Sequence, residues 1–265
     1  MTITLWEKDI PYAQEGEKTP NSMTFYPTKT WYPTPTVVVL PGGGYKIRAE
    51  HEGESIAKFY QSRGFQAFVV NYRCMPNRFP CALSDAQQAI KIIRRRADEF
   101  HVDPNAIFVI GFSAGGHLAG CLATMDDVCP KDDEVYASIS PKPTGAILSY
   151  PVISTETLDG SPANQCVLSL IEGLSIPQEK LSLEKIVSEN TSPCFLWHTV
   201  ADTTVSVTHS LRFCEALRHK NVPFELHVYP DGPHGLGLAQ MYPEVATWCE
   251  HSVDWILRMS RPTRQ

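Results

Sequence analysis

Residues 106–123 read AIFVIGFSAGGHLAGCLA, an apolar run followed by a turn of small residues and a second apolar stretch. This order predicts a strand, a tight turn with Ser113 at its tip, and a helix. Glycines on both sides of the serine leave no side chain to collide with the facing backbone. The hydroxyl would then stand at the N-terminus of the helix, where free N–H groups favour developing negative charge. A helix start made of small residues, with an idle serine, is the alternative to this nucleophile elbow.

The rest of the chain alternates predicted strands with predicted helices. Apolar and β-branched runs predict strands at 2–6, 22–26, 36–40, 66–71, 106–110, 145–150, 194–198 and 224–229. Helical spacing predicts helices at about 53–63, 82–100, 205–220 and 243–258. We expect a turn at 103–105 and a polar loop at 126–142. Strands that alternate with crossover helices specify an α/β fold, with a mainly parallel sheet and helices on both faces.

The length of 265 residues suits one large α/β domain over 1–265. Residues 151–190 interrupt the alternation. They are mixed polar, with short helical pieces expected near 162–172 and 177–187. We therefore expect a small lid-like insertion above the carboxyl edge of the sheet.

Charge and composition exclude several kinds of partner. The net charge is −6 and the pI about 5.8, so we expect no basic surface that would bind nucleic acid. The basic run 94–96 lies in a helical pattern and is interpreted as a solvated face. No stretch approaches the roughly 18 apolar residues that a membrane span needs, and residues 1–9 do not resemble a signal peptide.

The eight cysteines, at 74, 81, 121, 129, 166, 194, 214 and 249, include no C-x-x-C pair. Several fall in apolar patterns, which predicts reduced, mostly buried thiols and a cytoplasmic protein. A mature chain that has lost its leader stays an alternative. We expect no metal and no cofactor, because the acidic residues 126–127 and 132–134 read as solvated loops and Gly42–Gly44 lacks the dinucleotide spacing.

A serine nucleophile needs a histidine base, itself held by a carboxylate. Asp202 follows the predicted strand 194–198, and His234 follows the predicted strand 224–229 within the glycine-rich stretch PDGPHGLG at 230–237. The order Ser113, Asp202, His234 is the one expected of a nucleophile elbow in the middle of such a sheet. A helix N-cap is the alternative role for Asp202.

Competing groups fit less well. His117 lies one helical turn past Ser113 and is expected to point down the helix. The other histidines are expected within strands, at 198 and 227, or on helix surfaces, at 209, 219 and 251. Of the other carboxylates, Asp231 shares the loop of His234 and Glu225 lies within a strand.

The stretch PGGG at 41–44 ends a predicted buried strand and offers backbone without side chains beside the elbow. Acyl transfer places charge on the carbonyl oxygen, and preorganised N–H groups stabilise it. We predict that the N–H groups of Gly43, Gly44 and Ala114 form this oxyanion hole.

Together these motifs resemble the esterase/lipase group of α/β-hydrolases related to hormone-sensitive lipase, and its short acetyl xylan esterase-like members in particular. The matching pieces are PGGGY at 41–45, HEGE at 51–54, NYR at 71–73, GFSAGGHLA at 111–119, SYPVI at 149–153, the loop through Asp202, and PHG at 233–235. The resemblance spans about 35–240 and implies the α/β-hydrolase fold and a Ser-His-Asp triad. Two departures are Pro41, where most relatives have histidine, and the missing N-terminal helical cap. The pocket should therefore be open, or covered mainly by 151–190.

The first functional hypothesis is hydrolysis of short-chain, acetyl-type esters, with a small-molecule ester as the partner. The resemblance implies acetylated sugars or xylo-oligosaccharides. A peptidase or amidase of the prolyl-peptidase or formamidase type, and a non-catalytic binding protein on a hydrolase scaffold, are the alternatives. The sequence does not decide whether the protein forms a homo-oligomer. Trp31, Tyr32, Tyr45 and Trp197 are read as aromatic core, with a sugar-stacking wall as the alternative.

Overall fold

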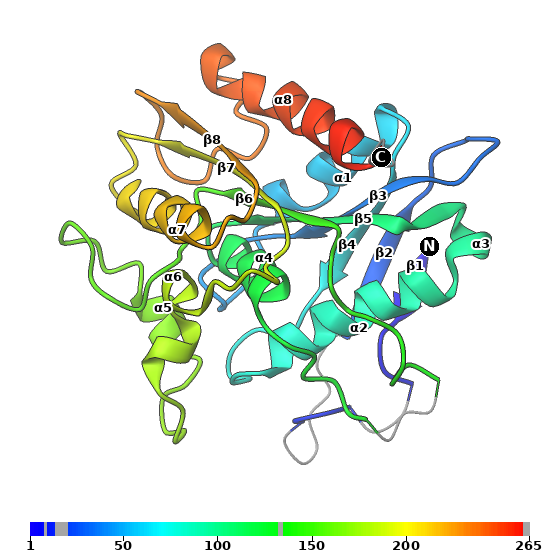
Figure 1. Ribbon diagram of the computed structural model, residues 1–265, viewed down its shortest axis with the longest axis horizontal. Coiled ribbons are helices and arrows are strands. Elements are labelled where there is room, and N and C mark those ends of the chain that lie inside the picture. Colours follow the sequence, from blue (N-terminus) through cyan, green and yellow to red (C-terminus); the bar gives the residue numbers. More distant parts are fainter. Residues whose placement is uncertain (8–9, 14–20, 132–134, 262–265) are drawn as a thin grey trace.

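The computed structural model describes residues 1–7, 10–13, 21–131 and 135–261. Its strands are β1 (Thr2–Thr4), β2 (Ser22–Tyr26), β3 (Thr34–Leu40), β4 (Gln66–Asn71), β5 (Val102–Phe112), β6 (Gly145–Ser149), β7 (Cys194–Thr199) and β8 (Phe224–Tyr229). In the described ranges these eight strands form one sheet, ordered β1-β2-β4-β3-β5-β6-β7-β8 (Figure 1). Strand β2 pairs antiparallel with β1 and with β4, and every pair in the series β4-β3-β5-β6-β7-β8 is parallel.

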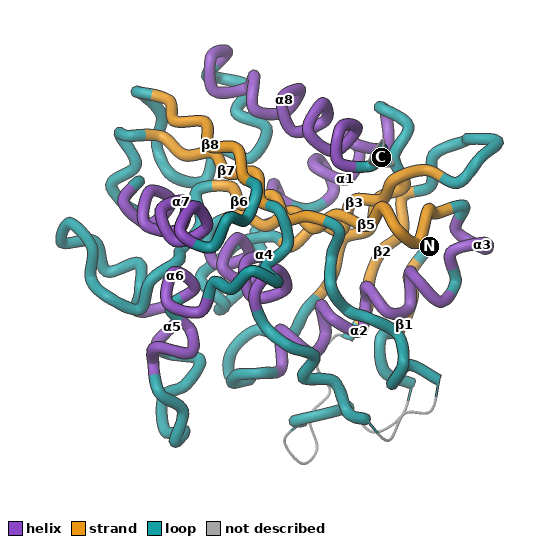
Figure 2. The backbone as a smooth tube through the Cα atoms, in the orientation of Figure 1, coloured by secondary structure: helices purple, strands orange, loops and turns teal. Residues whose placement is uncertain are grey.

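The helices cover both faces of this sheet (Figures 1 and 2). The main ones are α1 (Glu54–Ser62), α2 (Cys81–Arg95), α4 (Ala114–Thr124), α7 (Thr208–His219) and α8 (Pro243–Met259). Helices α2, α4 and α7 share one apolar core with the sheet, and α1 and α8 share a second core on the other face. The central strands are covered on both sides, so residues 37–40 of β3 and 106–112 of β5 form continuous buried runs without charged side chains. The predicted α/β class is confirmed.

Two local predictions need correction. The helix expected over 82–100 is divided at Arg96 into α2 and α3 (Ala97–Phe100). The turn expected at 103–105 is wrong, because β5 begins at Val102 and stays extended through these residues. Thr34 pairs with Val102 but Thr36 pairs with Ile107, so the extra residues of β5 are taken up as a bulge.

Residues 151–190 lie at the carboxyl edge of the sheet, as expected, with less helix than the sequence suggested. They contain α5 (Gln165–Leu168), the 3-10 turn η2 (Gln178–Leu181) and α6 (Leu183–Ile186). Helix α6 packs on α4 and α7, which ties the segment to the body of the fold. A second 3-10 turn, η1 (Glu50–Glu52), precedes α1.

All eight cysteines lie in the described ranges, and none forms a disulfide. No helix in the described part of the chain combines the length and apolarity needed to cross a bilayer. Among the same residues no cluster of three or more histidine, cysteine or carboxylate side chains has the arrangement of a metal site.

Candidate active site

Ser113 occupies the sharp turn between β5 and α4 that the sequence predicts. Its φ of 54° and ψ of −116° lie outside the regions that most residues adopt. Two residues before and two residues after Ser113, the turn has room only for glycine. A Cβ on Gly111 would lie 1.9 Å from the Gly115 carbonyl oxygen, and one on Gly115 would lie 2.1 Å from the Leu40 oxygen. The chain thus holds Ser113 in a strained backbone conformation at the carboxyl edge of the sheet.

The three side chains expected to act together are joined by hydrogen bonds. The Nε2 atom of His234 lies 2.8 Å from the Ser113 hydroxyl, and its Nδ1 lies 2.6 Å from Oδ2 of Asp202. Ser113, Asp202 and His234 lie in the loops that follow β5, β7 and β8. The carboxyl ends of these strands meet at one edge of the parallel sheet. The Thr199 hydroxyl donates to the Gly232 carbonyl at 2.7 Å and anchors the start of the His234 loop.

Asp202 uses its two oxygens differently. Oδ1 accepts the backbone N–H groups of Thr204 and Val205, both at 2.9 Å, and so holds its own turn. It is not the N-cap of α7, which begins six residues later at Thr208. Burial raises the pKa of the carboxyl group, but hydrogen bonds from His198 and His234 outweigh burial and leave the pKa below its ordinary value. Asp202 is therefore ionised and oriented toward the imidazole.

His198, which is expected within a strand and lies in β7, contacts Asp202. Its Nε2 lies 3.4 Å from Asp202 Oδ2 and 2.9 Å from the Val205 carbonyl, and its Nδ1 lies 2.8 Å from the Ser210 hydroxyl. A carbonyl partner requires a protonated Nε2, so His198 donates toward the carboxylate. The spacing of four residues to Asp202 was the available clue, but it does not reveal which way the strand faces.

The glycine loop lies directly against the nucleophile. A Cβ on Gly42 would lie 2.6 Å from the Phe112 carbonyl oxygen and 3.1 Å from Ser113 Cβ. Gly43 and Gly44 have positive φ values of 116° and 64° and line the same cleft as Ser113. Within the described residues, neither of their N–H groups donates a hydrogen bond. Ala114 is the first residue of α4, where backbone N–H groups have no partner inside the helix.

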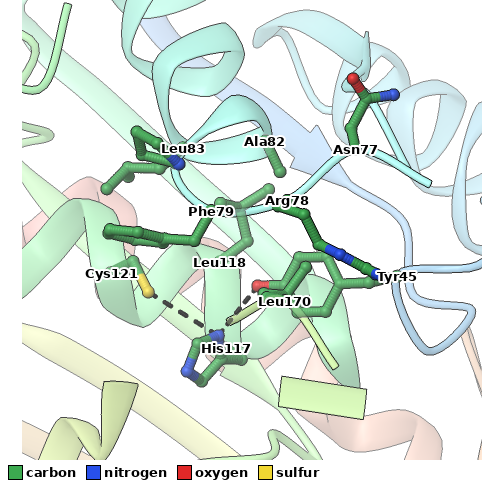
Figure 3. Close-up of a pocket in the computed structure, with 11 residues that line it drawn as sticks. Tyr45, Asn77, Arg78, Phe79, Ala82, Leu83, His117, Leu118, Cys121 and Leu170 are labelled. Carbon is green, nitrogen blue, oxygen red and sulfur yellow. Dashed lines mark hydrogen bonds between the residues drawn. The ribbon is translucent and has the colours of Figure 1, made fainter. Parts of the chain in front are cut away.

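The competing histidines are engaged elsewhere. His117 is buried in the core, where its Nδ1 accepts from the Tyr45 hydroxyl at 2.8 Å (Figure 3). Its Nε2 donates to the Leu181 carbonyl at 2.9 Å. Burial lowers the pKa of His117 to about 4. The surface position expected for His209 is wrong. It is fully buried, and its Nδ1 accepts the N–H groups of Ile153 and Ser154, both at 3.1 Å.

Among the described residues, neither of the other carboxylates considered forms a hydrogen bond or ion pair with His234. Asp231 is exposed, and Glu225 pairs with Arg258 and lies 3.6 Å from His227 on the edge strand β8.

Ser113 and His234 open into a cleft of about 940 Å³. Segment 151–190 supplies one wall through Val152, Pro162, Ala163, Gln165, Cys166 and Ser169. The wall is mixed polar and apolar and contains none of the four aromatic residues considered for stacking. Tyr45 and Trp197 are buried in the core as expected, whereas Trp31 is 99% exposed and Tyr32 64% exposed.

Comparison with known proteins places this geometry in a family. The sequence profile of the family BD-FAE matches residues 24–217, and that of the prolyl oligopeptidase family matches residues 176–262. An acetyl ester-xyloside bifunctional hydrolase from Caldicellulosiruptor lactoaceticus superposes with a TM-score of 0.90 at 38% identity, over 98% of this chain and 96% of the other.

Two curated relatives are larger proteins. Endo-1,4-beta-xylanase B of Butyrivibrio fibrisolvens is 40% identical over 210 residues, which are 77% of this chain and 32% of the relative. An acetylxylan esterase of Xylanibacter ruminicola is 28% identical over 232 residues, which are 85% of this chain and 46% of the relative. The chain thus spans about a third to a half of these relatives. The profile match covers well over half of the chain, and the chain belongs to the BD-FAE family of α/β-hydrolase esterases.

Proposed function

We propose that this protein is a serine carboxylesterase that removes acetyl groups from acetylated xylo-oligosaccharides. The hydrogen-bonded series Ser113–His234–Asp202, with distances of 2.8 and 2.6 Å, carries the proposal. The series opens into a cleft rather than into the core, which gives a substrate access to the hydroxyl.

The proposed reaction begins with acylation of Ser113. The Oγ atom attacks the carbonyl carbon of the ester while Nε2 of His234 accepts the hydroxyl proton. The carbonyl oxygen becomes an oxyanion that accepts hydrogen bonds from the N–H groups of Gly43, Gly44 and Ala114. As the carbon–oxygen bond to the alcohol breaks, His234 returns the proton to the departing oxygen, and an acetyl-Ser113 ester remains.

Deacylation reverses the roles with water. Nε2 of His234 takes a proton from water, and the resulting hydroxide attacks the acetyl carbonyl. The tetrahedral intermediate collapses, Ser113 recovers its proton from His234, and acetate leaves. The ionised carboxylate of Asp202 holds the imidazole by Nδ1 and stabilises the imidazolium present in both halves of the reaction.

The substrate class rests on the cleft and on the relatives. Gln165, Ser169, Thr203 and Thr204 line the cleft and offer hydrogen-bonding groups suited to sugar hydroxyls. The relatives are named for acetylxylan esterase and acetyl ester-xyloside activities. A cleft of about 940 Å³ has room for an oligosaccharide of a few residues on the alcohol side.

Acetate release from acetylated xylo-oligosaccharides tests the proposal, with Ser113→Ala as the control. A series of p-nitrophenyl esters tests the acyl preference, and we expect the highest kcat/KM for acetate. A maximum at eight or more acyl carbons would contradict it.

One observation favours a second candidate, hydrolysis of peptides or amides. The prolyl oligopeptidase profile matches residues 176–262, the part that carries Asp202 and His234. Aminoacyl p-nitroanilides discriminate the two candidates. We expect their kcat/KM to lie far below that of acetyl esters, and the reverse order would favour the peptidase.

We further propose that residues 1–265 form one α/β-hydrolase domain in which 151–190 acts as an insertion bordering the substrate. A cytoplasmic location is supported by six buried cysteines without a disulfide. Titration of the thiols after purification without an oxidant tests whether the cysteines are reduced, and we expect all eight to react once the protein is unfolded.

A further inference from the structure

Glu52 places a buried carboxylate between two loops of the active site. Only 2% of the residue is exposed. Oε2 accepts the backbone N–H of Gly42 at 2.8 Å, and Oε1 accepts the Tyr150 hydroxyl at 2.6 Å. Each oxygen thus has a donor. Glu52 belongs to the HEGE motif at 51–54, and the sequence alone predicts no role for it.

Tyr150 extends the connection to the loop of the base. Its phenolic oxygen accepts the N–H of Gly237 at 3.0 Å, three residues past His234. The tyrosine ring also meets the His234 imidazole edge-on, with 4.9 Å between centroids, and makes a second edge contact with Trp197, again with 4.9 Å between centroids. Tyr150 therefore supports the His234 loop through both its hydroxyl and its ring.

These contacts form one continuous path. It runs from Gly42 N–H to the Glu52 carboxylate, to the Tyr150 hydroxyl, and to Gly237 N–H. The Nε2 atom of His51 lies next to this path, 3.0 Å from the Gly235 carbonyl oxygen and 3.6 Å from Glu52 Oε1. The path joins the loop that carries the proposed oxyanion donors to the loop that carries the proposed base.

Catalysis needs those two loops at a fixed separation. The oxyanion donors and the imidazole act on atoms of one tetrahedral intermediate, and a misplacement of about 1 Å can cost on the order of 100-fold in rate. We propose that Glu52, acting through Tyr150, is a positioning residue that sets the separation between the Gly43–Gly44 N–H groups and the imidazole of His234. The inference rests on the proposed esterase function and adds to it a residue that does not itself react.

The test uses Glu52→Gln and Tyr150→Phe, assayed with p-nitrophenyl acetate. In Glu52→Gln an amide NH₂ replaces one carboxylate oxygen, so it faces one of the two donors, Gly42 N–H or the Tyr150 hydroxyl. In Tyr150→Phe, Gly237 N–H and Glu52 Oε1 both lose a partner. We expect kcat to fall by roughly 10- to 100-fold in each variant, with KM nearly unchanged. Because both changes break the same path, the double variant should lose little more than the worse single variant.

Tyr60→Phe is the matched control. The Tyr60 hydroxyl of α1 lies 2.7 Å from the Ser252 hydroxyl of α8, and both residues are buried. Within the described residues, neither hydroxyl forms a hydrogen bond to a residue of either loop. This variant also deletes a buried tyrosine hydroxyl, so its thermal midpoint should fall, while its kcat stays that of the wild type.

The outcomes are separable. Wild-type kcat in folded Glu52→Gln and Tyr150→Phe, or fully multiplicative losses in the double variant, overturns the positioning role. If Glu52→Gln does not fold, the kcat of Tyr150→Phe compared with that of Tyr60→Phe decides the question. An equal kcat in these two variants overturns the positioning role. A wild type that hydrolyses p-nitrophenyl acetate but no acetylated sugar refutes the substrate proposal and leaves the positioning test intact. A wild type inactive on every ester refutes both.

Discussion

Nδ1 of His234 lies 2.6 Å from Oδ2 of Asp202, although 32 residues of chain separate them. The carboxylate has lost nearly all contact with solvent, so its negative charge is directed to the imidazole. In Asp202→Asn the amide NH₂ would face Nδ1 and favour the wrong tautomer of the ring. We expect kcat for p-nitrophenyl acetate to fall about 10⁴-fold.

Asp159→Asn is the control for that variant. Asp159 accepts hydroxyl hydrogen bonds from Ser206 and Thr208 in the same region but is exposed and does not contact His234. Its kcat should stay within about twofold of the wild type, the scale of a minor surface change. An Asp202→Asn enzyme within tenfold of the wild type would contradict the role given to the carboxylate.

His198 is expected to support Asp202. Asparagine places its amide near the position of Nδ1 and glutamine near that of Nε2, so only His198→Gln retains a donor directed at the carboxylate. Loss of a hydrogen bond to a charged group costs roughly 1.5–3 kcal/mol. We therefore expect kcat to be about tenfold lower in His198→Asn than in His198→Gln, measured with p-nitrophenyl acetate. Equal rates in the two variants would show that the contact at 3.4 Å contributes nothing.

Substitution of Gly43 tests the oxyanion loop. A Cβ there would lie 2.4 Å from the Ile47 carbonyl, so the loop must shift. Gly173→Ala is the matched control because Gly173 also has positive φ but open space around it. Both variants should lose about 1–2 kcal/mol of stability from the left-handed backbone. Only Gly43→Ala should lose activity, by roughly 100-fold in kcat, and equal activity in the two would exclude the loop from the reaction.

Two buried histidines predict acid sensitivity of the fold. Burial lowers the pKa values of His117 and His209 to about 4, against about 6.5 in the unfolded chain. Below pH 6.5 the two histidines bind protons in the unfolded state but stay neutral in the folded state. The free energy of unfolding therefore falls as the pH drops toward 4. The expected loss is about 2 kcal/mol per ring at pH 5.

Urea unfolding at pH 7 and pH 5 measures that loss, and NMR shows the charge state of each ring. Both rings should remain neutral at pH 5 in the folded protein. Rings that titrate near pH 6.5 without loss of stability would contradict the account.

The sequence predicted the parts of this structure that local chemistry dictates. The elbow was recognisable because the glycines around Ser113 are required by backbone contacts as short as 1.9 Å. Strands β4 and β8 were predicted with the bounds observed, since their apolar runs are flanked by turns. The order of Ser113, Asp202 and His234 was enough to bring them to one edge of a parallel sheet.

Features that depend on tertiary packing were harder to predict. His209 was expected on a helix surface, yet Ile153 and Ser154 of segment 151–190 donate their backbone N–H groups to its ring. The extended course of 103–105 follows from pairing with β3, which overrides the turn preference of the sequence. Glu52 contacts Tyr150, which is 98 residues away in the sequence, so no local pattern indicated this pair. His198 lies four residues before Asp202, but that spacing does not show which face of the sheet the His198 side chain occupies.

The most direct test of the account is covalent labelling of the folded wild-type protein with a fluorophosphonate, with the adduct mapped by peptide mass spectrometry. We predict a single adduct on Ser113, absent in Ser113→Ala and formed at least 100-fold more slowly in His234→Gln, since the serine then lacks its base. No adduct on Ser113, or one that forms equally fast without His234, would contradict the claim that these residues form a working nucleophile and base.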